Sequence, residues 1–360
     1  MFEVKSQDGR ARAGLIRVRA GTVETPFFMP VITRSSLARF GTEDYYGLGA
    51  GSDLCRLAGT SAAICNSLIG SFSPGLETIV AGRGVHNLLE FHRPLFTDSG
   101  GYQVVPGSSF VSHLNHEGIK FVADWCNTEI LLTPRESMRI QQSMGSDVAM
   151  VLDDMGGVNA SRERQLLALE RSHRWAESCL LHHSDPEQLL FGICHGGPHE
   201  DLRSQSAAHI SNLGFSGVAI GGIALLHDRV LKLRSVRAAL REIHTDRLRY
   251  VMGVGHPADI LEMVAEGIDC FDAAFPTIQA QRGVWLSDRG MFTKHGLSQQ
   301  LSPSEGGGLP SPAAHNLRFM EQFMRNVRTA IAARRFAQFR DAFLAQWAKI
   351  PGTRPSVSPG

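Results

Sequence analysis

Eight short apolar runs, separated by stretches with helical character, most constrain the fold of this 360-residue chain. Each run ends in a polar or glycine-rich stretch, and strands that alternate with helices are typical of βα units around a parallel sheet. Eight such units predict a (β/α)8 TIM barrel. A doubly wound open sheet is the competing fold, but no GxGxxG motif follows the first run. The predicted strands are 27–31, 62–66, 94–98, 148–153, 189–194, 217–220, 249–253 and 268–272.

The rest of the chain fits around this barrel. Thr133, Pro134 and Glu136 form a capping-box pattern with proline at the first helical position. A stripe with the period of a helix predicts a C-terminal helix that packs on the core; its residues are Leu317, Met320, Met324, Val327 and Ile331.

Three segments depart from plain βα connections. Residues 104–132 are too many for a simple loop, so we expect a hairpin insertion after the third strand. Residues 301–314 read as a flexible loop and 351–360 as a flexible tail. We therefore expect a single catalytic barrel domain over 1–350, with a reduced insertion at about 291–314.

Composition excludes several classes of protein. Hydrophobic residues make up 43% of the chain, which is enough for a sizeable core and excludes general disorder. The net charge of +1 gives no overall attraction to nucleic acid, although a local basic face is compatible with it. No apolar run approaches the length of a membrane span, and the N-terminus lacks a signal-peptide pattern, so we expect a cytoplasmic protein. The six cysteines form no CxxC motif, which disfavours a zinc ribbon or a thioredoxin-like site.

Carboxylates at strand ends are the candidate catalytic groups, because chemistry in such barrels occurs at the C-terminal ends of the strands. Asp98 directly follows one apolar run and Asp272 ends another, whereas Asp269 lies earlier in its strand and is the weaker candidate. Two carboxylates at one mouth suit displacement at an anomeric carbon, where one attacks and the other handles the proton of the leaving group. The alternative for each is a helix cap or a salt bridge.

A third acidic site follows the fourth predicted strand at Asp153 and Asp154. A carboxylate there can accept hydrogen bonds from N1–H and the exocyclic amine of guanine, two donors that adenine lacks at those positions. The alternative is again a capping aspartate.

With these residues in place, the chain resembles the queuine tRNA-ribosyltransferases, also called tRNA-guanine transglycosylases. Any one match is weak, but seven matches run in the family order across nearly the whole chain. The matching stretches are 23–31, 97–103, 145–150, 219–222, 250–255, 267–272 and 315–318.

The resemblance implies a barrel enzyme, a pentosyltransferase, that exchanges guanine at the tRNA wobble position for a 7-deazaguanine such as queuine or preQ1, without a redox cofactor. It implies that Asp272 is the nucleophile on ribose C1′ and that Asp98 is the general acid and base. It also implies two sets of binding residues. The base would contact Ser99, Gly100, Gly101, Tyr102, Asp153, His195, Gly222 and Met252, and the anticodon loop would contact Gly253, Val254, Gly255, His256, Pro257, Thr277 and Arg282.

The chain departs from the family pattern in three places. The family usually binds structural zinc through three cysteines and a histidine, but here only His315 remains, so we expect no metal. His195 stands where the family commonly has glutamine, and two interpretations stay open: a different choice of incoming base, or a conservative replacement that keeps the same guanine contact. Ile278 and Gln281 stand where basic residues are usual, so we expect weaker phosphate contacts near the nucleophile unless Arg282 compensates. The zinc region also supports dimers in the family, so both a homodimer and a heterodimer stay open.

Four functions stay open at this stage. The first is the tRNA base exchange just described, and the second is the same chemistry on DNA or another RNA. The third is a non-catalytic, RNA-binding partner subunit of a transglycosylase, which the presence of both Asp98 and Asp272 disfavours. The fourth is a barrel enzyme that acts on a small glycoside, for which Asp153 has no role.

Overall fold

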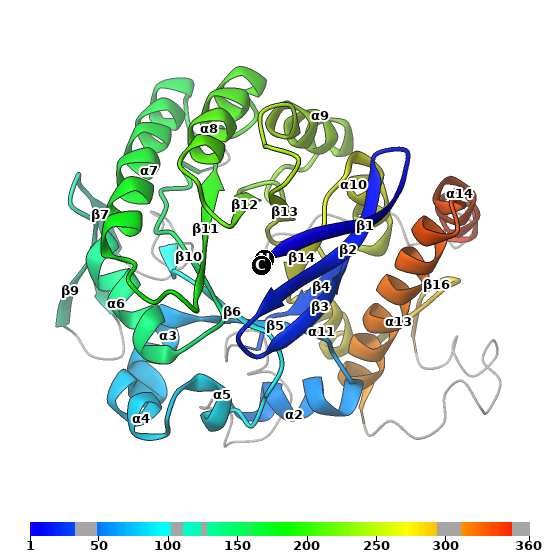
Figure 1. The fold of residues 1–360 in the computed structure, drawn as a ribbon, viewed down its shortest axis with the longest axis horizontal. Helices are drawn as coiled ribbons and strands as arrows, with labels where there is room; N and C mark the ends of the chain where they lie inside the picture. The colour runs from blue at the N-terminus through cyan, green and yellow to red at the C-terminus, as the bar shows by residue number, and fades with distance from the viewer. Residues whose placement is uncertain (33–48, 102–110, 124–127, 158, 294–310, 348–360) are drawn as a thin grey trace.

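The computed structural model describes residues 1–32, 49–101, 111–123, 128–157, 159–293 and 311–347 (Figure 1). Within these residues, eight parallel strands form one sheet in the order β4-β14-β13-β12-β11-β10-β6-β5. The sheet closes into a barrel where the Ile32 N–H donates to the Ile64 carbonyl at 2.9 Å. The prediction of a (β/α)8 barrel is confirmed, and each predicted strand is present with ends that shift by at most three residues. The strands are β4 (Phe27–Pro30), β5 (Ala63–Asn66), β6 (Leu95–Asp98), β10 (Val148–Met150), β11 (Leu189–Cys194), β12 (Gly217–Ile220), β13 (Leu248–Val251) and β14 (Cys270–Ala273).

Aromatic side chains contribute to a packed barrel core. The rings of Phe27 and Phe96 are 6.0 Å apart, and the rings of Phe96 and Phe191 are 5.8 Å apart in an edge-to-face arrangement. All three side chains are fully buried. The strands are apolar along their length because barrel strands are covered on both faces, which is why short apolar runs predicted them.

Helices surround the barrel sheet (Figure 1). Thr133 caps α6 as predicted, since its hydroxyl oxygen accepts the Glu136 N–H at 3.1 Å, and Pro134 is the first helical residue. The C-terminal stripe is buried as predicted, and α13 packs against α2, α11 and the strand β15. The helices are α2 (Gly49–Ala58), α3 (Ser67–Gly70), the π-helix η1 (Ser71–Gly75), α4 (Leu76–Ala81), α5 (Val85–Leu88), α6 (Pro134–Met144), α7 (Arg162–His182), α8 (Glu200–Asn212), α9 (Arg229–Leu240), α10 (Pro257–Glu266), α11 (Phe275–Gln281), α13 (Pro312–Ala332) and α14 (Phe336–Trp347).

Two small sheets interrupt the βα pattern. The insertion after the third barrel strand is an antiparallel meander of β7 (Val111–Leu114), β8 (Ile119–Ala123) and β9 (Thr128–Leu132), so the predicted hairpin carries an additional strand. A second hairpin joins β15 (Val284–Ser287) to β16 (Gly290–Thr293).

The loop predicted over 301–314 is wrong at its C-terminal end. Helix α13 already begins at Pro312, because the Ser311 hydroxyl accepts the Ala314 N–H at 3.3 Å and proline suits the first helical position. The rest of that loop, as far as residue 310, and the tail 351–360 lie outside the described residues.

An N-terminal antiparallel sheet of β1 (Phe2–Asp8), β2 (Ala11–Val18) and β3 (Gly21–Thr25) crosses one end of the barrel, and is drawn in dark blue in Figure 1. Arg12 of β2 donates to both carboxylate oxygens of Asp269, at 2.8 and 2.6 Å, and Ala20 N–H donates to Asp147 at 2.8 Å. Asp269 and Asp147 directly precede barrel strands, so the sheet covers the N-terminal end. The C-terminal end, where chemistry is expected, is the opposite end.

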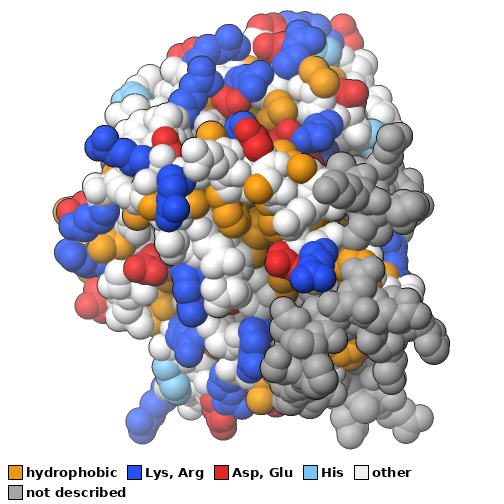
Figure 2. Space-filling model, turned by 90° about the vertical axis from the view of Figure 1, so that its right-hand side faces the viewer, with side chains coloured by type: hydrophobic (Ala, Val, Ile, Leu, Met, Phe, Trp, Pro, Cys, Tyr) orange, Lys and Arg blue, Asp and Glu red, His pale blue; other side chains and the backbone are white. Residues whose placement is uncertain are grey.

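The molecular surface carries mixed charges. Figure 2 looks onto the side of the molecule that lies at the right in Figure 1, where Lys and Arg side chains are interspersed with Asp and Glu. Among the residues that the structure describes, no helix is long and apolar enough to cross a lipid bilayer.

Candidate active site

The parallel strands bring predicted site residues to the C-terminal end of the barrel. Two of them lie within strands, Asp98 as the last residue of β6 and Asp272 in β14. The others follow a strand within three residues. Those residues are Asp153 after β10, His195 after β11, Gly222 after β12 and Met252 after β13. Tyr102, predicted to stack on the base, lies outside the described residues.

Asp98 is a carboxyl group whose pKa is raised from 3.8 to about 7. Removal from bulk water is the largest cause, and the negative charges of Asp153 and Asp272 raise the pKa further. Hydrogen bonds from the backbone N–H groups of Ser99 and Gly100 act in the opposite direction. A group with a pKa near 7 is suited to both donating and accepting a proton at neutral pH.

Asp272 is held by two neutral donors. The Tyr250 hydroxyl donates to its Oδ1 at 2.6 Å, and the Gly253 N–H donates to the same oxygen at 2.8 Å. Burial raises the pKa of Asp272 above its usual value, and these two hydrogen bonds oppose that effect. Burial, together with Asp272, raises the pKa of Tyr250 well above 10, so the phenol keeps the proton that it donates. The arrangement orients a carboxylate without neutralising it.

Asp153 is paired with the buried residue His195. The His195 Nε2 lies 2.6 Å from Asp153 Oδ2, and the His195 N–H donates to the Ser206 hydroxyl at 3.1 Å. Two glycines make room for this pair. A methyl group on Gly101 would lie 3.1 Å from Asp153 Oδ1, and one on Gly221 would lie 2.3 Å from the His195 ring. The segment after Asp98 is therefore in contact with Asp153.

Asp154, the other member of the acidic pair, does not join this group. Its carboxylate is buried and pairs with Arg164, at 2.8 Å, and with Arg171. It also accepts the Gly156 N–H at 3.0 Å. Of the two alternatives for the pair, Asp154 therefore has the structural role.

A small space lies beside the pair of Asp153 and His195. Gly222, which has a φ of +72°, and His195 border a cavity of about 10 Å³ together with Met155 and Leu225. That volume holds one water molecule, so a purine fits there only if flexible side chains such as Met155 and Leu225 move. Met252 is partly buried against the core at the end of β13.

The residues predicted to contact RNA differ in accessibility. Gly253 and Arg282 are exposed, whereas Val254, Gly255 and Pro257 are buried. The side chains of the remaining two, Thr277 and His256, contact other residues of the protein. The hydroxyl of Thr277 is buried and donates to the Ala274 carbonyl at 2.8 Å, and the His256 ring packs edge-on against Phe275 and Trp347.

His315 has a structural environment. Its Nε2 lies 2.9 Å from the Leu286 carbonyl oxygen, and its ring packs against Trp285 with the centroids 4.9 Å apart. Among the described residues, no group of three or more His, Cys, Asp or Glu side chains is arranged to hold a metal ion. The sequence has no cysteine after Cys270, so the residues near His315 do not fit the four-ligand zinc site that the family resemblance implies.

Tyr250 was not among the predicted site residues, and Gly253 was predicted to contact RNA rather than Asp272. Tyr250 and Met252 are two residues apart in the predicted strand 249–253, so alternation places both on the same face. That signal was available. The contact between Tyr250 and Asp272 depends on the register in which β13 pairs with β14, and the sequence pattern does not predict that register.

Comparison with known proteins identifies the family of this chain. A family model described as queuine tRNA-ribosyltransferase matches residues 7–307. Proteins named queuine tRNA-ribosyltransferase are similar along nearly their whole length. The one from Nitrosomonas europaea is 33% identical over 96% of this chain and 97% of its own. Those from Acidithiobacillus ferrooxidans and Thermotoga petrophila are 34% and 33% identical, over 95% and 94% of this chain and 96% of each relative.

Proposed function

The chain belongs to the queuine tRNA-ribosyltransferase family of pentosyltransferases, and on that basis we propose that it exchanges guanine at the wobble position of a tRNA for a 7-deazaguanine. The observation that carries the proposal is the pair of carboxyl groups at one barrel mouth. Asp98 has a pKa of about 7, and Asp272 is held by the neutral donors Tyr250 and Gly253. Asp98 can therefore carry a proton at neutral pH, and Asp272 is oriented as a nucleophile.

In the first half of the exchange, Asp272 attacks C1′ of the guanosine. The hydrogen bonds from Tyr250 and Gly253 are both accepted by Oδ1, so we assign Oδ2 as the oxygen that forms the new C1′–O bond. The bond from C1′ to N9 breaks, and its electrons leave with guanine. Protonated Asp98 supplies the proton that the leaving base takes up. The ribose is then an ester of Asp272, and the phosphodiester backbone is intact.

In the second half, a 7-deazaguanine binds in place of guanine. Its ring nitrogen N9 attacks C1′ and loses its proton to the Asp98 carboxylate, which regenerates the acid. The C1′–O bond to Asp272 breaks and frees the nucleophile. Two displacements at the same carbon retain its configuration, so the product keeps the β-linkage of a normal nucleoside.

Asp153 recognises the base edge in this proposal. One carboxylate accepts from N1–H and from the exocyclic amine, which both guanine and 7-deazaguanines possess. His195 acts through Asp153, because its Nε2 lies 2.6 Å from the carboxylate and fixes its orientation. His195 is thus a positioning residue whose replacement by glutamine is expected to change the relative KM values of guanine and preQ1.

We propose that the chain performs this reaction without the zinc of its family, because the residues around His315 cannot supply three thiolates. A cytoplasmic location follows from the proposed tRNA substrate. The same chemistry on DNA or another RNA is the second candidate, favoured by Ile278 and Gln281 at positions where basic residues are usual.

The test is to trap the covalent intermediate. Protein is incubated with unfractionated tRNA, a DNA stem-loop or an RNA stem-loop, without an exchange base, and adducts are resolved by denaturing electrophoresis. Wild type is expected to form an adduct with tRNA, and Asp272→Asn is expected to form none. Asp288→Asn, an exposed aspartate between β15 and β16, is the matched control and should behave as wild type. An adduct with DNA or the RNA stem-loop but not with tRNA supports the second candidate, and equal adduct yields from wild type and Asp272→Asn refute the mechanism.

A further inference from the structure

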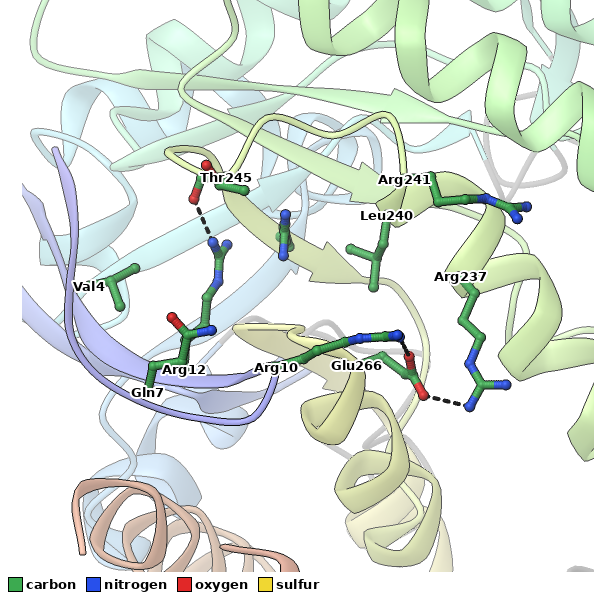
Figure 3. Close-up of a pocket in the computed structure, with 10 residues that line it drawn as sticks. Val4, Gln7, Arg10, Arg12, Arg237, Leu240, Arg241, Thr245 and Glu266 are labelled. Atoms are coloured by element: carbon green, nitrogen blue, oxygen red, sulfur yellow. Dashed lines mark hydrogen bonds and ion pairs between the residues drawn. The ribbon is translucent and has the colours of Figure 1, made fainter. Parts of the chain in front are cut away.

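A second concave site lies at the opposite end of the barrel from Asp98 and Asp272. It is a cavity of about 630 Å³ between the N-terminal sheet, α9, α10 and the start of β13 (Figure 3). This volume is in the range of pockets that bind small molecules. Five arginines line it. They are Arg10, Arg12, Arg237, Arg241 and Arg249.

Carboxylates neutralise only part of this charge. Arg12 is paired with Asp269, at 2.8 and 2.6 Å. Arg10 and Arg237 share the single carboxylate of Glu266, at 2.7 and 2.6 Å, as the dashed lines in Figure 3 show for this group. Arg241 lies 3.7 Å from Glu200, which Arg234 also contacts. Five guanidinium groups therefore surround a cavity with two close carboxylates, and the local charge is positive.

A buried arginine in the cavity wall, Arg249, gives independent evidence for an anion-binding site. Its side chain lies in the cavity wall with an exposed fraction of 9%, and its Nε–H is buried without a hydrogen-bond partner. Its Nη2 donates to the Ile243 carbonyl at 3.2 Å. Burial, and then the nearby charge of Arg12, lowers the pKa of Arg249 to about 10. A buried guanidinium with few hydrogen-bond partners is costly, and an anion against the side of Arg249 that lines the cavity would lower that cost.

We propose that this cavity is a binding site for a small phosphorylated molecule of up to mononucleotide size. Planar guanidinium groups bind phosphate oxygens in pairs, which suits a site built from arginine rather than lysine. A phosphate or pyrophosphate group can reach Arg249 inside the cavity, whereas the backbone of a folded RNA would contact only the rim. The site uses no residue of the proposed catalytic centre, so the binding proposal can be tested separately from the proposed reaction.

Calorimetric titration with inorganic pyrophosphate, and separately with inorganic phosphate, tests this proposal at low ionic strength. The informative variant is Arg237→Gln combined with Arg241→Gln, because both side chains are more than half exposed and can change without opening the core. Arg234→Gln is the matched control, since Arg234 lies on the same helix, is 61% exposed and does not line the cavity. Arg249→Gln, checked for folding by circular dichroism, tests the buried donor.

Wild type is expected to bind one pyrophosphate per chain, and the double variant at least about tenfold more weakly. The control should stay within about twofold of wild type. An absence of saturable binding to wild type, or equal weakening in the control, overturns the proposal. Displacement of pyrophosphate by tRNA, with a matching loss of tRNA affinity in the double variant, assigns the arginines to RNA and also overturns it.

Discussion

Replacement of Asp98 by asparagine is expected to stabilise the protein at alkaline pH while it removes the proposed acid and base. The pKa of Asp98 is raised from 3.8 to about 7 in the folded protein, whereas the unfolded chain keeps a value near 3.8. Between these values the unfolded state has lost its proton and the folded state still holds it. The unfolded state therefore binds fewer protons, and stability falls as pH rises through this window.

The size of the effect follows from the two pKa values. Each pKa unit corresponds to about 1.4 kcal/mol, so the raised pKa of Asp98 reduces the free energy of unfolding by about 4 kcal/mol at pH 8 and by about 2 kcal/mol at pH 5. Asparagine has no charge to bury and is close to aspartate in shape. The stability gain of Asp98→Asn over wild type should therefore be larger at pH 8 than at pH 5 by about 2.5 kcal/mol.

Urea unfolding of wild type and Asp98→Asn at pH 5 and pH 8 measures this difference directly. Asp246→Asn is the control, because it removes one negative charge from an exposed loop side chain. Its stability relative to wild type should be nearly the same at both pH values. If the gain of Asp98→Asn does not grow between pH 5 and pH 8, or if Asp246→Asn shows the same growth, Asp98 does not carry a raised pKa and its assignment as the acid loses its physical basis.

Three further changes test the surroundings of the site. Asp153→Asn removes the charge that raises the pKa of Asp98 more than Asp272 does, so the alkaline limb of kcat/KM for guanine exchange should move to lower pH; an unmoved limb contradicts the coupling. Tyr250→Phe removes one donor to Asp272 and should slow adduct formation in single-turnover assays roughly tenfold or more, whereas an unchanged rate would show that the hydrogen bond has no role in the attack. Asn316→Ala removes a buried amide that bonds Leu286 and two carbonyl groups and should lower the free energy of unfolding by about 3 kcal/mol, compared in urea with the exposed Asn326→Ala, which should lose much less.

The barrel could be predicted from the sequence because each parallel strand is a short apolar run that ends in polar residues. This pattern follows from burial on both faces and needs no knowledge of neighbouring strands. The placement of Asp98 and Asp272 followed from the same rule, since all parallel strands end at one mouth. The start of α13 was predictable from Ser311 and Pro312 but was assigned to a loop, because the Ser-, Pro- and Gly-rich stretch before it masked the capping signal.

The sequence could not show which of Asp153 and Asp154 faces the candidate active site and which is held by arginines. Strand β10 ends at Met150, so the alternation of side chains does not extend to Asp153 and Asp154. Their directions depend on partners that are distant in sequence. Arg171 comes from α7 and binds Asp154, while His195 follows β11 and binds Asp153. Sequence patterns indicate which residues are near a strand end, but only the packed structure shows which charge each one meets.

Asp269, which directly precedes β14, and Asp272, which lies within it, show why that distinction matters for chemistry. Asp269, at the N-terminal end, is paired with the guanidinium of Arg12 at 2.6 Å, and this pair anchors the N-terminal sheet. Asp272, three residues later at the other end, meets only neutral donors among its described hydrogen-bond partners, Tyr250 and Gly253. A guanidinium partner stabilises a carboxylate strongly and lowers its tendency to attack carbon, whereas a phenol and an amide orient it and leave most of its charge available. An aspartate just before β14 therefore has a structural role, whereas an aspartate near the C-terminal end of the same strand is suited to nucleophilic attack.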